Sequence, residues 1–223
     1  MRELEIVSIV DAIKEDLERR VLDGELRPGE HLREKELAVA YDVGRHTLRT
    51  AFDGLVSRGI LQKERDRGVF VRVSTERDLM EIYDLRALLE THAFRILAKN
   101  RHVPPMAVDA LTELAGLDEH SPRHAVIEAD LAFHRAMVEG AGNQRLARAY
   151  EGLGAETRLL LAQLVNGYAT APELAQEHSE LVAVLTKGDP VMAEAAIRQH
   201  LDEAIEWLSG HLVAPTGLPP GTV

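Results

Sequence analysis

Four residues in the second half of the sequence combine the chemistry and the spacing of a metal site. Asp130 and His134 are four positions apart, so on a helix they share one face, with Cβ atoms about 5–6 Å apart. At this distance a carboxylate oxygen and an imidazole nitrogen can bind the same cation. His178 and His200 lie well inside two later helical segments, and helical bundles build ligand sites from inward side chains on facing helices. One Asp and three His suit Zn²⁺, Ni²⁺, Co²⁺ or Mn²⁺, and the ligand types alone do not choose among them.

The competing interpretation is that these histidines are surface residues or satisfied core residues, because the chain contains ten histidines. His92 lies in the middle of a predicted helix and fits either interpretation. Five others lie near predicted turns or helix ends: His31, His102, His120, His124 and His211. Spacing alone therefore leaves both interpretations open. The chain has no cysteine, which excludes disulfides, thiolate zinc sites and a cysteine nucleophile, so a tight metal site has to use His and carboxylate.

Near the N-terminus, a Gly-Arg-His-Thr-Leu-Arg stretch has the composition of a helix that reads DNA bases. Arg45 and Arg49 are one turn apart and share a face of the predicted helix. Arg can donate two hydrogen bonds to O6 and N7 of guanine, and Thr47 can reach a phosphate or a thymine methyl group. His46 lies at the same helix start. In a helix-turn-helix the second helix presents such N-terminal residues to the major groove.

Two flanking pairs of residues suit contacts to the DNA backbone. Arg33 and Lys35 lie at the start of the preceding helix, where they could bind phosphates. Arg67 and Gly68 lie at the tip of a predicted hairpin, which would follow the backbone or the minor groove. An isolated Arg-x3-Arg pair would indicate only a solvated helix face. The ordered set of turn, basic helix and glycine-tipped hairpin favours DNA binding instead.

The elements that position these basic residues follow the order of a winged helix-turn-helix. Apolar residues recur at helical spacing between Ile6 and Val21, and a turn containing Pro28-Gly29 follows. Two short β-rich runs flank a charged turn and predict a hairpin. The predicted elements are helices at about 6–21, 34–41 and 45–58, and strands at 60–63 and 69–73. This segment, residues 1–73, is the predicted DNA-binding domain.

From residue 77 onward the sequence carries no strand signal. Helical patterns are punctuated by Pro, Gly and capping residues, and Ser121 and Asp189 each precede a proline as an N-cap precedes position N1. The predicted helices lie at about 77–99, 104–117, 122–140, 143–167, 172–187 and 190–211. We therefore expect a mainly α protein: a winged helix-turn-helix, a linker at 74–76, an all-α bundle at 77–212, and a disordered Pro- and Gly-rich tail at 213–223.

Taken over the whole chain, the net charge argues against nucleic-acid binding. The chain has 26 Lys and Arg against 37 Asp and Glu, a net charge of −11, and an acidic surface repels phosphate. The acid is unevenly distributed, however. Residues 1–73 have a net charge of −1 and residues 74–223 one of −10, while nine basic residues face six acidic ones between Arg33 and Arg72. This division indicates two domains with different surfaces and leaves a basic strip for DNA.

The sequence also predicts the cellular compartment of the protein. No uncharged apolar run approaches the roughly 18 residues that a membrane span requires. The N-terminus is too acidic and too periodic for a signal peptide. We expect a cytoplasmic protein with no membrane partner.

The N-terminal segment resembles the DNA-binding domain of GntR-type bacterial transcription regulators. The shared motifs are G-x-L-x-P-G-x-x-L at 24–32, E-L-A at 36–38, the helix entry at 44–49 and R-G-x-F-V at 67–71. The resemblance covers residues 5–73 and implies binding to operator DNA. It places five residues on the family's DNA-contacting positions: Lys35, Arg45, Thr47, Arg49 and Gly68.

The all-helical half resembles the FCD ligand-binding domain found in one group of these regulators. The D-x-x-F-H-x-x-M motif at 130–137 is followed by Gly142-Asn143, and a single His follows on each of the last two helices. The resemblance implies that Asp130, His134, His178 and His200 bind a metal ion, with Zn²⁺ expected before Ni²⁺, Co²⁺ or Mn²⁺. It also implies that Arg86 faces an effector pocket. Six predicted helices imply the shorter version of this domain.

Together these observations predict a metabolite-responsive regulator that binds a palindromic operator as a homodimer. A small organic acid would bind beside the metal, with Arg86 neutralising its far end. Asn143 could donate a hydrogen bond to this effector or could serve only as a helix N-cap. The alternatives are a sensor of the metal itself, a purely structural ion, or a metal-dependent hydrolase. The hydrolase needs a general base beside the metal, which the sequence does not place, so we do not expect an enzyme.

Overall fold

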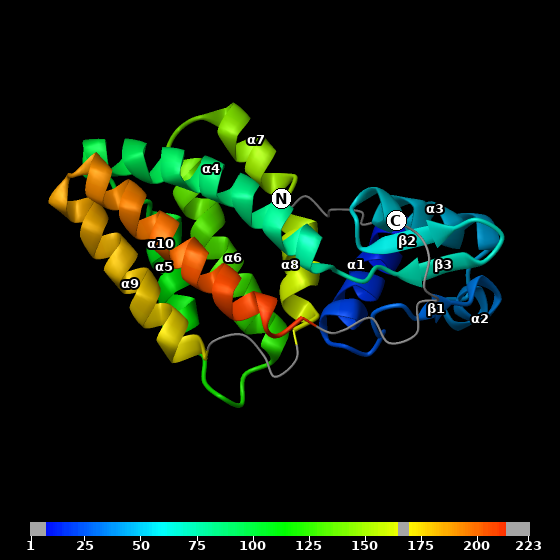
Figure 1. Ribbon diagram of the computed structural model, residues 1–223. Helices are drawn as coiled ribbons and strands as arrows, with labels where there is room; N and C mark the ends of the chain where they lie inside the picture. The colour runs from blue at the N-terminus through cyan, green and yellow to red at the C-terminus, as the bar shows by residue number, and fades with distance from the viewer. Residues whose placement is uncertain (1–7, 165–169, 213–223) are drawn as a thin grey trace, which may run out of the picture. The chain divides into compact units, whose positions relative to one another are not determined.

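The computed structural model describes residues 8–164 and 170–212, and the chain divides into two compact units between Val73 and Ser74 (Figure 1). The predicted tail at 213–223 lies outside the described residues. So does Ile6, the first apolar residue of the predicted N-terminal helix.

The first unit contains three helices at the places that the apolar spacing predicts. They are α1 (Ile9–Leu22), α2 (Glu34–Ala40) and α3 (Arg45–Ser57). The helix α3 packs against both α1 and α2, with Leu48 and Leu55 fully buried. Gly44 is the N-cap of α3 and has no side chain to cap it, so the first amides of α3 are left open at its N-terminus.

A three-stranded antiparallel sheet completes the first unit. The strands are β1 (His31–Leu32), β2 (Leu61–Glu64) and β3 (Gly68–Val71), in the order β1-β3-β2. The pairs Leu61–Val71 and Glu64–Gly68 set the register of the hairpin, which the sequence predicted. The strand β1 was not predicted, because two residues are too few to show the alternation that identifies a strand. The winged helix-turn-helix expectation is confirmed.

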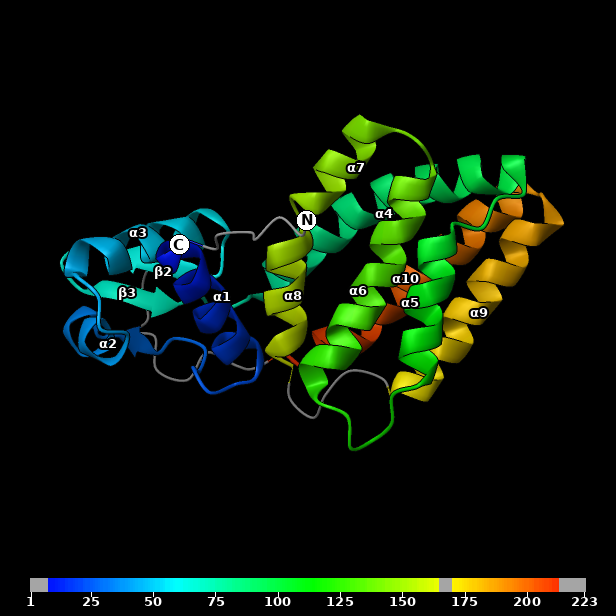
Figure 2. The same cartoon turned by 180° about the vertical axis from the view of Figure 1, so that it is seen from behind.

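The second unit is helical, apart from one isolated bridge between Leu164 and Leu212. Its described helices are α4 (Glu76–Asn100), α5 (Pro105–Ala115), α6 (Arg123–Gly140), α7 (Gln144–Glu151), α8 (Gly154–Ala162), α9 (Ala171–Lys187) and α10 (Pro190–Ser209). The long helices α4 and α10 make the most extensive contact, while α5 packs against both α6 and α9 (Figure 2).

Local interactions decide where these helices begin. Thr75 and Asp78 form a capping box at the start of α4, and the Ser74 amide donates a hydrogen bond to the Gln163 side chain at 2.8 Å. Residues 74–76 therefore belong to the second unit and are not the predicted linker. Asp189 caps α10 as predicted. The prediction for Ser121 was wrong, because its hydroxyl pairs with Asp118 while Pro122 takes the N-cap position of α6.

The single helix predicted at 143–167 was also wrong. The structure has two helices, α7 and α8, separated around Gly152, and residues 165–167 lie outside the described residues. Glycine is a poor helix former, and Gly154 follows two residues later, so the backbone can turn here at little cost. The described part of the second unit therefore has seven helices, and the expected six-helix, shorter version of the domain is not what the structure has.

The core of the second unit is mainly apolar, and its buried charged and imidazole side chains lie together. Buried side chains from α4, α6, α9 and α10 form a single cluster that includes Phe94, Phe133 and Leu201. Charged and imidazole groups are rarely fully buried unless they are paired or bind a metal. Six such residues nevertheless lie buried together in this unit: Arg86, Glu90, Asp130, His134, His178 and His200.

Candidate metal centre and nucleic-acid interface

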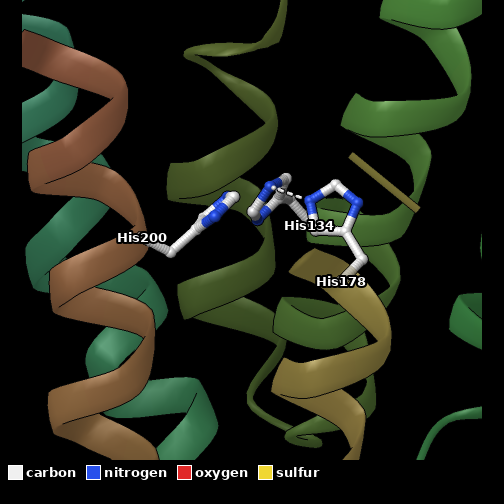
Figure 3. A group of neighbouring side chains, drawn as sticks. All are labelled: His134, His178 and His200. Carbon is white, nitrogen blue, oxygen red and sulfur yellow. Dashed lines mark hydrogen bonds between the residues drawn. The ribbon is translucent and has the colours of Figure 1, made fainter. Parts of the chain in front are cut away.

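Three imidazoles converge in the core of the helical unit. His134 projects from α6, His178 from α9 and His200 from α10, and the rings point toward one another (Figure 3). One nitrogen from each ring lies within 4.8 Å of the others. The Nε2 atoms of His134 and His178 are 3.2 Å apart. The structure thus brings the three predicted histidines together from three separate helices.

Asp130 lies beside this triad, one turn before His134 on α6. Its Oδ1 atom is 3.4 Å from Nε2 of His178 and 3.9 Å from Nε2 of His134. Among the described residues, Oδ1 has no hydrogen-bond donor although it is buried. A buried carboxylate oxygen without a donor is costly, and a cation between it and the imidazole nitrogens would remove that cost.

The outer nitrogens of the imidazoles are mostly held by carboxylates. Nδ1 of His134 is 2.6 Å from Oε2 of Glu90, which is fully buried. Nδ1 of His200 is 3.2 Å from Oε2 of Glu177. A carboxylate at Nδ1 keeps the proton on that nitrogen and leaves the lone pair of Nε2 free to bind a metal. Nδ1 of His178 is buried and has no hydrogen-bond partner within the described chain.

Glu90 is the residue that sequence reasoning missed. Besides His134 it accepts hydrogen bonds from Nε of Arg86 at 2.9 Å and from the hydroxyl of Tyr150 at 3.0 Å. One signal was present in the sequence: Glu90 lies four residues after Arg86, so the two share a face of α4. Nothing in the sequence, however, connected that face with the later histidines.

Arg86 has capacity to bind a further group. Its guanidinium is buried, and its carbon lies 4.7 Å from the centroid of the Tyr83 ring. Nη2 has no hydrogen-bond partner among the described residues, so part of the guanidinium is unused. An unsatisfied buried guanidinium nitrogen favours an anion, and a carboxylate is the group that matches its planar geometry.

Burial and charge set the protonation of this cluster. Burial, reinforced by His134, His200 and Arg86, lowers the pKa of His178 well below its usual range, so its ring stays neutral. Burial opposes the ionisation of Glu90, but Arg86 and His134 outweigh it and hold the pKa of Glu90 below its usual range. Burial also raises the pKa of Tyr83 to about 12, so its phenol stays protonated. A neutral imidazole and an ionised carboxylate are the states that bind cations.

A small pocket of about 180 Å³ lies between α9 and α10 and reaches His200. Glu177, Glu180 and Glu203 line it together with His200. The predicted effector residue Asn143 lies elsewhere, exposed at the N-cap of α7, where its side chain accepts hydrogen bonds from the amides of Arg145 and Leu146. The structure supports the capping role of Asn143, and an effector contact by this residue stays a prediction.

In the first unit, the predicted base-reading residues lie at the start of α3. Arg45, His46 and Arg49 are exposed and Thr47 is half-buried. Arg49 donates from Nε to Glu34 of α2 at 2.7 Å, and this hydrogen bond raises the pKa of Arg49 above its usual value. The guanidinium of Arg49 therefore stays charged, and Glu34 of α2 orients it.

A groove of about 610 Å³ joins the start of α2, the exposed face of α3 and the hairpin. Four of the predicted DNA contacts line it: Arg33, Lys35, Arg49 and Gly68. Arg67 lies at the hairpin tip beside Glu64, with its guanidinium 5.5 Å from the centroid of the Phe70 ring. The structure thus groups the predicted contacts on the α2, α3 and hairpin side of this unit.

Gly68 has a structural reason for being glycine. Its φ is +108°, a conformation that L-residues with a side chain rarely adopt. A Cβ atom at this position would lie 2.6 Å from Nε2 of His31 on the neighbouring strand β1. Asp42, between α2 and α3, also has a positive φ of 50°, which Asp tolerates better than most residues.

Comparisons with known proteins agree with both units. The family model "Bacterial regulatory proteins, gntR family" matches residues 9–71, and the model "FCD domain" matches residues 81–203. The chain is 30% identical to a protein of Paenarthrobacter nicotinovorans named for the repressor of a D-xylose utilization operon, over 87% of this chain and 86% of that one. This chain belongs to the GntR family and carries an FCD domain.

Other GntR relatives cover the chain to a similar extent. The Nta operon transcriptional regulator of Aminobacter aminovorans is 29% identical over 82% of this chain and 89% of its own. A solved GntR transcriptional regulator from Rhodococcus sp. RHA1 superposes with a TM-score of 0.80 and is 25% identical, over 90% of this chain and 97% of its own. The protein is therefore a DNA-binding transcription regulator of the GntR and FCD type, and not an enzyme. Within the described residues, no helix has the length and apolarity to cross a membrane.

Proposed function

We propose that this GntR regulator binds a palindromic operator as a homodimer and that its affinity for DNA responds to a small organic acid bound at a metal centre in the FCD domain. The observation that carries this proposal is the meeting of three imidazole nitrogens, a buried carboxylate oxygen and a buried guanidinium nitrogen in one core. Among the described residues, this oxygen has no donor and this nitrogen has no partner. Cation ligands and an anion partner lie in the same core.

The residues present fit a divalent cation. Asp130, His134, His178 and His200 would hold it, and neutral imidazoles with one carboxylate suit Zn²⁺ first, with Ni²⁺, Co²⁺ and Mn²⁺ as alternatives. A bound ion would supply coordination positions at which a carboxylate can replace water.

The protein's own groups would orient the acid. Nη2 of Arg86, which has no partner in the described parts of the chain, would neutralise one carboxylate, and the bond from Arg86 Nε to Glu90 holds the guanidinium in place. Because Glu90 also holds His134, the acid and the cation would be positioned by one shared carboxylate. The names of relatives support an organic effector: one is the gluconate operon repressor of Bacillus subtilis, 24% identical over 89% of this chain.

The effector would act by favouring one arrangement of the DNA-binding units over another. A ligand can shift such an equilibrium only through different affinities for the two states. The site draws its ligands from α6, α9 and α10, so binding would change how these helices pack. We expect a change in operator affinity of about 5–150-fold, the usual range of coupling between sites.

Calorimetry tests the effector. Metal-loaded and chelated protein are each titrated with a panel of mono-, di- and hydroxy-carboxylates. We expect binding of at least one acid to loaded protein only, and loss of that binding in Arg86→Met. If no acid binds in either form while the metal alone changes operator affinity, the protein senses the ion itself. If neither acid nor metal changes operator affinity, the sensing role is wrong.

The proposed DNA contacts are Arg33, Lys35, Arg45, His46, Thr47, Arg49, Arg67 and Gly68. A footprint on the DNA upstream of the chain's own gene tests them. Arg49→Ala should abolish protection of a two-fold-symmetric site, whereas His200→Ala should leave protection by chelated protein intact. Full protection by Arg49→Ala would overturn the assignment of α3 as the recognition helix.

A further inference from the structure

The four proposed metal ligands lie beneath the protein surface, and one of them reaches a pocket. Asp130, His134 and His178 are at most 2% exposed, whereas His200 is 7% exposed. His200 also lines the pocket between α9 and α10, which none of the other three does. A cation cannot readily cross an apolar core, because it would lose its hydration without gaining ligands. A polar route is therefore needed, and this pocket ends at a proposed ligand.

The walls of this pocket carry negative charge. Glu177 and Glu180 come from α9 and Glu203 from α10, and the described residues that line the pocket include no Lys or Arg. Gln176 donates a hydrogen bond to Glu180 at 2.9 Å, and Gln199 donates one to Glu203 at 2.7 Å. An amide donor orients a carboxylate without cancelling its charge. Acidic walls in a narrow cleft raise the local concentration of cations.

Exposed acidic residues are common on a chain with a net charge of −11, so these carboxylates alone do not indicate a ligand. A second, independent observation does. Oδ1 of Asp130 is buried without a hydrogen-bond donor in the described part of the chain, and it lies beside three imidazole nitrogens that are within 4.8 Å of one another. His200 belongs both to this triad and to the lining of the pocket.

Glu177 connects the pocket with the buried centre. Its Oε2 atom is 3.2 Å from Nδ1 of His200, and 47% of its side chain is exposed. Glu90, which contacts Nδ1 of His134 in the same way, is completely buried. The two outer carboxylates thus differ in environment. Glu90 can only hold the centre, whereas Glu177 can also meet a hydrated cation.

We infer that the pocket between α9 and α10 is the route by which a divalent cation enters and leaves the buried centre. Glu180 and Glu203 would attract the hydrated cation, Glu177 would receive it at the inner end, and His200 would be the first imidazole that it reaches. The inference rests on the proposed metal centre and adds how the cation arrives there. Charges along an entrance act mainly on the rate of association.

Rate measurements test the role of the carboxylates. Metal-free, full-length protein is mixed with Zn²⁺ in a stopped-flow instrument, and a fluorescent zinc indicator reports the free ion. Glu180→Gln/Glu203→Gln should lower the association rate constant about 10-fold at low ionic strength, and the loss should shrink as salt is added. Glu177→Gln keeps an acceptor for the imidazole but loses the charge, so it should also slow association. Glu194→Gln/Glu206→Gln removes the same charge from exposed positions of α10 outside the pocket and should keep the wild-type rate.

Blocking the pocket is a second test, which does not depend on charge. The chain has no cysteine, so Gln199→Cys carries its only thiol and can be labelled after folding. A benzyl methanethiosulfonate label should slow the association and the release of Zn²⁺ by the same factor and leave the affinity unchanged, because a route has one barrier for both directions. A methyl label on the same cysteine is the matched control and should leave both rates unchanged.

The outcomes separate the route from the metal centre itself. If the wild-type chain does not bind Zn²⁺, or if His134→Ala binds it equally well, the proposed centre is wrong and the route with it. If Zn²⁺ binds at the triad but the benzyl-labelled protein associates at the wild-type rate, only the route is wrong. A label that speeds release without slowing association would also overturn the route. A wild-type rate in Glu180→Gln/Glu203→Gln would overturn the role of these carboxylates.

Discussion

The carboxylate of Glu90 lies 2.6 Å from Nδ1 of His134, in a core from which both side chains are almost completely shielded from water. The same carboxylate accepts hydrogen bonds from Arg86 and Tyr150. Glu90 therefore links the proposed cation ligands on α6 to the proposed anion partner on α4.

This relationship predicts that Glu90→Gln weakens metal binding without removing any proposed ligand. Loss of an outer carboxylate partner typically reduces metal affinity about 10–100-fold. The affinity for Zn²⁺ is measured by competition with a chromophoric chelator. Glu113→Gln, an exposed change on α5, should leave the affinity unchanged. Equal affinities for Glu90→Gln and wild type would show that Glu90 does not support His134.

Metal should stabilise the protein through the buried triad. Zn²⁺ at about 100 times its dissociation constant should add about 2.7 kcal/mol to the free energy of unfolding of chelated protein. Denaturant titrations with and without the ion measure this difference. His134→Ala should abolish the gain, while the exposed His120→Ala should keep it. A gain of the same size in His134→Ala would place the metal elsewhere.

The stability of the chelated protein should depend on pH because of His178. Its pKa is lowered by burial in the folded state, so below about pH 6.5 the unfolded chain takes up a proton that the folded chain does not. The free energy of unfolding should therefore fall as pH decreases below this value, by up to about 1.4 kcal/mol per pH unit. Glu90 contributes only at lower pH, since its lowered pKa affects stability below about pH 4.3.

Denaturation of chelated protein at a series of pH values from below pH 4.3 up to pH 8 measures this slope. In His178→Gln, the free energy of unfolding should change less with pH between pH 5 and pH 6.5. Its decrease below pH 4.3 should remain, because Glu90 is unchanged. An unchanged slope in His178→Gln would assign the proton uptake to another group.

Gly68 should be intolerant of a side chain for two reasons, its φ of +108° and the ring of His31. Gly24 has a φ of +74° but open space around its Cβ position, so it is a matched control for the first reason alone. Gly24→Ala should cost about 1 kcal/mol and Gly68→Ala about 1–3 kcal/mol, measured by denaturant unfolding. Adding His31→Ala should recover part of the loss at Gly68, and no recovery would show that the ring is not in the way.

Much of the fold could be predicted because it depends on local signals. Apolar spacing and caps such as Asp189 place most helices within a few residues. The predictions that were wrong also have local causes. Gly152 interrupts the helical apolar pattern of residues 143–167, and the strand β1 is too short to show an alternation of apolar and polar residues. Ser121 has the right neighbour for a cap, but its hydroxyl bonds to Asp118 instead.

The ligand chemistry follows from residue types and spacing alone. A chain without cysteine has only imidazoles and carboxylates for a tight metal site, and Asp130 and His134 share a helix face because they are four residues apart. Packing between helices brings His178 and His200 to that pair and places Glu90 against His134. It also leaves Nη2 of Arg86 without a hydrogen-bond partner among the residues that the structure describes. Spacing reports neighbours within one helix, whereas contacts between helices depend on how their apolar faces pack.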